Sequence, residues 1–166
     1  MDFLTPPSGR VLHLGAGLTQ QFRHTLARYL DDAQVRYCAL LEESGSLCAE
    51  AGDASLRDAG ETAALAAGAF AALQAVAKRL GDGTFEGLFH EGKVRQFCLV
   101  PVTPQFMLLS VFEAPVRFGV VKVCAAKAVA RLQEQIETMP ISGSGAPAEV
   151  ARGDFAREAA ALFLQA

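Results

Sequence analysis

The chain has 166 residues, of which 51% are hydrophobic and 20% are charged, and its formal net charge is −3. This length and composition fit one globular domain with short extensions and exclude an intrinsically disordered chain. The acidic balance and the scattered lysines and arginines argue against a nucleic-acid partner, because phosphate recognition needs a basic stripe.

A leader of residues 1–17 precedes a first helix, which Thr19 is expected to cap and which runs to about Leu30. Its apolar residues recur at helical spacing and give the helix one apolar face. They are Leu18, Phe22, Leu26 and Tyr29 or Leu30. The two aspartates that follow end this pattern.

A β-hairpin is expected next, formed by residues 36–42 and residues 46–51. Gly45 lies in the connecting turn, where glycine can adopt a positive φ.

An alanine-rich helix is expected over residues 61–80. Its small residues would let another backbone approach closely. Gly68 favours such a packing role, since glycine inside a helix costs about 1 kcal/mol relative to alanine. The alternative is that alanine is simply the best helix former. The stripe expected to be buried consists of Ala66, Ala69 or Phe70, Leu73, Val76 or Ala77, and Leu80.

Three strands are expected over residues 85–91, 93–102 and 105–113, and two of them contain continuous apolar runs at 97–100 and 106–109. A strand covered on one face alternates apolar and polar residues, whereas a continuous run indicates cover on both faces. The helices of one chain look too few to cover both faces of such a sheet. We therefore expect a second copy of the chain, or a partner, to supply the missing layer.

The last long helix is expected from about Arg117 to about Thr138. Its inward face is expected to follow steps of four residues. These residues are Val120, Cys124, Ala128, Leu132 and Ile136.

The end of the chain lies beyond the expected domain of residues 18–139. Residues 140–153 are a linker rich in Gly, Ser, Pro and Ala, and residues 154–166 predict a short helix. Such a short helix is marginal alone and needs a surface to dock on. Its own domain, a dimer mate and another protein all remain open. The apolar residues on one side of it are Phe155, Ala159, Leu162 and Phe163.

The sequence offers no pattern for catalysis, for a cofactor or for a metal. The histidines His13, His24 and His90 follow no metal-binding spacing. The four cysteines form no CxxC pair and are expected to be inert core thiols. No run of about 18 apolar residues is available to cross a membrane, and the N-terminus lacks a secretion signal. We therefore expect a cytoplasmic protein that is not an enzyme, with no membrane partner.

Three stretches, in their order and spacing, resemble the roadblock family, which is named for a dynein light chain and includes MglB-like bacterial proteins. They are the hairpin at residues 39–49, the alanine-rich helix at 63–80, and residues 96–123, in which an apolar strand pair leads to a glycine followed by aliphatic residues. The pair Ala114-Pro115 departs from the more polar connection often seen there. The resemblance implies an α+β roadblock/profilin-like sandwich in the order α-β-β-α-β-β-β-α, with a five-stranded antiparallel sheet. The C-terminal helix would extend this core.

The resemblance further implies a dimer, in which residues 85–91 pair with their mate and the two alanine-rich helices lie together on one face of the sheet. It implies no catalytic residue. The dimer-interface residues would be Ala66, Ala69, Phe70, Leu73, Phe85, Leu88, Phe89 and His90.

The resemblance also implies a partner, a small Ras-like GTPase of the MglA kind, whose activity the dimer would modulate. The candidate partner-binding residues are Ala67, Gln74, Lys78, Phe155, Leu162 and Phe163. Two other interpretations stay open. One is a structural dimerisation module without a nucleotide-linked role, and the other is an enzyme or small-ligand binder of profilin-like or sensor-like topology.

Overall fold

The computed structural model describes residues 15–56, 59–82 and 85–138, which form one antiparallel sheet with helices on both faces. The predicted order of elements and the five-stranded antiparallel sheet are confirmed. The leader, the linker and the short C-terminal helix lie outside the described residues, apart from the last residues of the leader. The elements are α1 (Ala16–Ala33), β1 (Tyr37–Glu42), β2 (Leu47–Gly52), the 3-10 turn η1 (Ala54–Leu56), α2 (Ala59–Arg79), β3 (Leu88–Glu91), β4 (Gln96–Thr103), β5 (Phe106–Phe112) and α3 (Phe118–Glu137).

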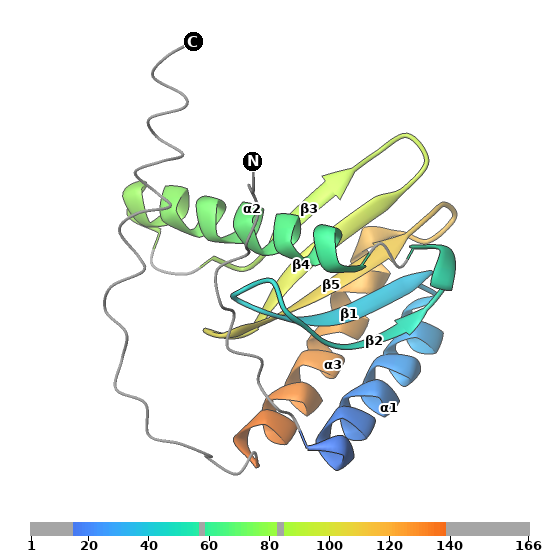
Figure 1. Ribbon diagram of the computed structural model, residues 1–166. Coiled ribbons are helices and arrows are strands. Elements are labelled where there is room, and N and C mark those ends of the chain that lie inside the picture. The colour runs from blue at the N-terminus through green and yellow to red at the C-terminus, as the bar shows by residue number, and fades with distance from the viewer. Residues whose placement is uncertain (1–14, 57–58, 83–84, 139–166) are drawn as a thin grey trace, which may run out of the picture.

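The strand order is β2-β1-β5-β4-β3, with β1 and β5 in the middle of the sheet. Figure 1 shows α2 on one face of the sheet and α1 with α3 on the other. None of the helices among the described residues combines the length and the apolar character that crossing a membrane requires.

The central strands β1 and β5 are buried on both faces, and for β5 the apolar run at 106–109 predicts this. On the α1/α3 side, Leu40 and Leu108 are fully buried, and on the α2 side Ala39 and Leu109 are buried. The chain's own α2 therefore covers the centre of the second face. For this central part of the sheet, the prediction that one chain has too few helices to cover both faces is wrong. The sheet is less covered at its β3 edge. There Leu88 and Phe89 are only partly buried, and the two residues of β3 that follow them are exposed.

Helix α1 begins before the expected cap. Its N-cap is Gly15, without a side-chain hydrogen bond, and Thr19 lies inside the helix. The helix also continues past the two aspartates, which are exposed, to the buried Ala33. Gln34 ends it in the left-handed conformation, and its Nε2 donates a hydrogen bond to the Asp31 carbonyl at 2.7 Å.

The buried face of α3 differs from the expected one at its first turn. The buried residues are Val121, Ala125, Ala128 and Leu132, whereas Val120 is 51% exposed. Steps of four residues drift by about 40° each around a helix of 3.6 residues per turn. A long series of such steps therefore cannot stay on one face, and Val120 turns outward.

Arg36 holds together three segments that are far apart in the sequence. Its guanidinium donates to Asp53 Oδ2 at 2.7 Å and to Glu113 Oε2 at 3.2 Å, and Arg95 Nε donates to Glu113 Oε1 at 3.2 Å. Hydrogen bonds from the Ser55 backbone N–H, the Arg36 guanidinium and the Ser55 hydroxyl lower the pKa of Asp53 to about 2.

We expect Asp53 to contribute to acid stability in a defined pH window. Because the folded-state pKa lies below the ordinary value of 3.8, the contribution is present above about pH 4 and is lost as the pH falls towards 2. Urea unfolding of the wild type and of Asp53→Asn across this range measures it. The difference in unfolding free energy should shrink with falling pH, and a difference that stays constant would contradict the assignment.

Candidate protein–protein interface

Helix α2 packs on the sheet through small residues and one aromatic ring. Ala63, Ala67 and Phe70 are buried against the strands, together with Tyr37 and Met107. The two alanines let the helix lie close to the sheet. The prediction that Ala67 contacts a partner from the exposed side of the helix is therefore wrong, because its side chain is enclosed within its own chain.

The outer side of α2 is apolar although it faces solvent. No charged residue occurs between Glu61 and Lys78. The large side chains Leu65 and Val76 are 74% and 50% exposed, and Leu80, just after the helix, is 82% exposed. Of the expected buried stripe, Leu80 is wrong, and of the alternatives Val76 or Ala77 it is Ala77 that is half-buried, because Phe70 fixes the rotation of the helix and turns Val76 away. Large exposed apolar side chains on one uncharged helix side are a feature of many protein association sites, which makes this side of α2 a candidate.

Strand β3 is the second unpartnered feature. It pairs with β4 on one side, and no described strand lies on its other side. The strand is shorter than expected, because Gly87 adopts φ +147 and interrupts the extended backbone before Leu88. An unpaired strand edge presents free N–H and C=O groups to another chain.

Aromatic contacts hold β3 in place from both faces. Phe89 stacks on Phe118 of α3 with ring centroids 4.1 Å apart, while His90 stacks on Phe97 of β4 at 4.7 Å. Phe85, just before the strand, meets Phe70 of α2 edge-on at 5.2 Å. The edge of β3 and the helix α2 are thus fixed relative to each other. We call the outer side of α2 and the outer edge of β3 the α2–β3 surface.

The expected dimer-interface residues divide between this surface and the core. Ala69 and His90 are exposed, Ala66, Leu73, Phe85 and Leu88 are half-buried, and Phe70 is buried. Phe89 is half-buried on the opposite, α3 side of the sheet. Gln74 and Lys78 are exposed on α2, whereas Phe155, Leu162 and Phe163 lie outside the described residues. The sequence does not single out Leu65 as exposed, and it predicts Leu80 and either Val76 or Ala77 in the buried stripe.

The polar chemistry of the described residues does not converge on one place. No group of three or more His, Cys, Asp or Glu side chains in this part of the chain could hold a metal ion. His24 and His90 are exposed, and His13 lies outside the described residues. All four cysteines are free thiols. Burial raises the pKa of Cys38 to about 12 and that of Cys98 to about 11, so both thiols stay neutral at pH 7.

Comparison with known proteins places this geometry among related chains. The model of the Roadblock/LC7 domain family matches residues 22–112, and a search of curated proteins found no match. Myxococcus xanthus MglB is similar at 25% identity and a TM-score of 0.71, over 76% of this chain and 95% of that chain. The gliding protein mglB from Thermus thermophilus is similar at 25% identity and a TM-score of 0.70, over 76% and 96%. A Roadblock/LC7 domain from Streptomyces avermitilis, at 18% identity and a TM-score of 0.64 over 70% and 98%, shares the fold.

Proposed function

We propose, because this chain belongs to the Roadblock/LC7 domain family, that it is a non-enzymatic dimeric regulator or scaffold which binds a small Ras-like GTPase. The family match and the likeness to two MglB structures bear out the resemblance seen in the sequence and support a roadblock-family regulator. The partner GTPase, the cytoplasmic location and the dimer are parts of the proposal.

The α2–β3 surface is the observation that carries the proposal. Pairing of two β3 edges would extend the sheet across two chains, and the uncharged outer sides of the two α2 helices would meet on the same face. Such a two-fold interface is self-complementary, because the same patch is used on both chains. Small side chains along α2 allow a close approach of the two helices. Gly68 would have a packing role there, since a Cβ at this position would meet open space beyond its own helix.

In this proposal the dimer contributes no catalytic group to the GTPase. It acts by binding one nucleotide state more tightly and so shifting the conformation of the GTPase's own active site. The exposed Gln74 and Lys78 near the end of α2 are the remaining described candidates for contact.

Nucleotide-dependent binding tests this function. The full chain is immobilised and offered a small Ras-like GTPase, beginning with any encoded beside this gene, loaded with GDP or with a non-hydrolysable GTP analogue. We expect several-fold stronger retention in one state and a changed rate of GTP hydrolysis. Equal retention in both states, or none, would contradict regulation and favour a structural dimerisation module.

Charge reversal at Lys78 gives a matched pair of variants. Lys78→Glu should weaken GTPase binding several-fold, mainly through slower association, because a charge at the rim of an interface steers encounter. Lys127→Glu makes the same change at an exposed lysine of α3, on the other side of the sheet, and should leave binding intact. Surface plasmon resonance measures the affinity of both variants for the GTPase. Equal losses of affinity would show that Lys78 acts only through the net charge of the chain and not through its position on α2.

A further inference from the structure

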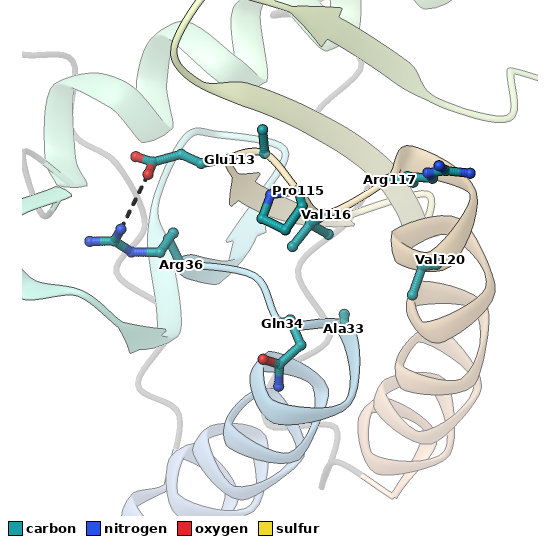
Figure 2. A pocket seen from close by; sticks show the side chains of 9 residues that line it. Ala33, Gln34, Arg36, Glu113, Pro115, Val116, Arg117 and Val120 are labelled. Carbon is teal, nitrogen blue, oxygen red and sulfur yellow. Dashed lines mark hydrogen bonds and ion pairs between the residues drawn. The ribbon is translucent and has the colours of Figure 1, made fainter.

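A second apolar region lies away from the α2–β3 surface, at the start of α3. An open hollow of about 550 Å³ is lined there by the end of α1, the β5–α3 connection and the first turn of α3. Figure 2 shows Pro115, Val116 and Val120 around it, with Arg36 and Glu113 joined at one rim. Val120 is 51% exposed, and Val123, its neighbour at the next turn, is 61% exposed.

This region needs a cover that the proposed dimer does not supply. The first turn of α3 lies on the face of the sheet opposite α2, so helices meeting through α2 would leave it open. Two exposed valines beside a concave apolar floor are costly to leave in water, at about 25 cal/mol per Å² of apolar surface.

We propose that the C-terminal segment, residues 154–166, folds back on its own chain and covers this hollow with Phe155, Leu162 and Phe163. These side chains recur at helical spacing along an otherwise alanine-rich stretch. In this proposal they are the large apolar side chains that fill the hollow. A volume of this size is in the range of about 300–1,000 Å³ in which proteins hold compact apolar ligands.

The chain is long enough to make this connection. Going from the end of α3 at Glu137 back to Val120 covers about 26 Å, at 1.5 Å per residue. Residues 138–153 can span about 50 Å when extended. The linker therefore reaches the hollow without strain.

A smaller concave site suits this segment less well. It lies between α1 and α3, measures about 230 Å³, and its lining includes four charged residues, Arg28, Asp32, Lys127 and Arg131. Burying phenylalanine and leucine there would desolvate these four charged groups, which is unfavourable. In the larger hollow there are three, and two of them, Arg36 and Glu113, already pair with each other.

Methyl NMR of the full chain tests the proposal. Aspartate is placed at Phe155, Leu162 and Phe163 together, and in a control chain at Ala160, Ala161 and Gln165, which helical spacing puts on the opposite side. Both triple variants add the same charge. The first should shift the methyl resonances of Val116, Val120 and Val123, and leave Val76 on α2 unchanged. The control should leave all four in place.

Nuclear Overhauser contacts between valine methyls and phenylalanine rings identify the occupant. A chain labelled at both residue types should show contacts from Val120 to Phe155 or Phe163, and the first triple variant should lose them. A mixture of chains carrying one label each should show none. Contacts in the mixture would mean that a second copy covers the hollow. That result, unchanged valine shifts, or shifts confined to Val76 would overturn the proposal.

Discussion

The Ala69→Asp variant is expected to be a monomer under conditions in which the unaltered chain is a dimer. Ala69 is exposed in the single chain and lies on the uncharged outer side of α2, where the proposed two-fold axis brings two helices together. The substitution therefore leaves the chain's own core intact. In the dimer it would place two aspartates in the interface, each removed from water without a cationic partner.

The expected loss is large because the symmetry doubles it. A buried polar group without a partner costs about 1–3 kcal/mol, and more when it is charged. Two copies cost about 2–6 kcal/mol, which raises the Kd of the dimer by roughly 30-fold or more. Light scattering coupled to gel filtration, over a range of concentrations, should give the mass of one 17.6 kDa chain for the variant and of two for the wild type.

Ala27→Asp is the matched control. Ala27 is an exposed alanine in the middle of α1, on the other side of the sheet, so the substitution has the same helix propensity and charge change. It should remain a dimer. Circular dichroism should show both variants folded. If both variants are dimers, the interface lies elsewhere. If both variants are monomers, added charge alone, rather than the position on α2, disrupts association.

The course of the chain through the sheet could be predicted from sequence, because strong local signals mark it. The apolar runs in β4 and β5 predict strands buried on both faces, and Gly45 in the β1–β2 turn adopts φ +88 as a glycine can. The rotation of α2 about its axis could not be predicted. This helix carries alanines on all of its sides, so its apolar pattern does not single out one face. The sequence does not distinguish Ala67 from Ala69, because the packing of Phe70 decides which of them is buried.

The polar contacts were also beyond prediction, for a different reason. Arg36 meets Asp53 and Glu113 from positions 17 and 77 residues away. Nothing local in the sequence marks these partners, since the sheet register alone brings them together.

The Gly52→Ala variant should lose about 2–6 kcal/mol of folding stability. Gly52 ends β2 opposite Tyr37 with φ +110, a conformation that costs a residue with a side chain about 1–3 kcal/mol. A Cβ there would lie less than 3.0 Å from the Arg36 carbonyl oxygen and the Tyr37 Cα. These are backbone atoms of the central sheet, which move only at a further cost of about 1–3 kcal/mol.

The position of Gly52 separates stability from association. It lies on the edge strand β2, at the end of the sheet opposite β3, so any folded fraction of the variant should still dimerise. Gly17→Ala is the matched control, because Gly17 lies in α1 with no atom within 4 Å of a new Cβ, and alanine favours a helix by up to about 1 kcal/mol. Urea unfolding should show a large loss for the first variant and none for the second. Equal unfolding midpoints for Gly52→Ala and the wild type would mean that the Tyr37–Gly52 end of the hairpin is looser than this packing requires.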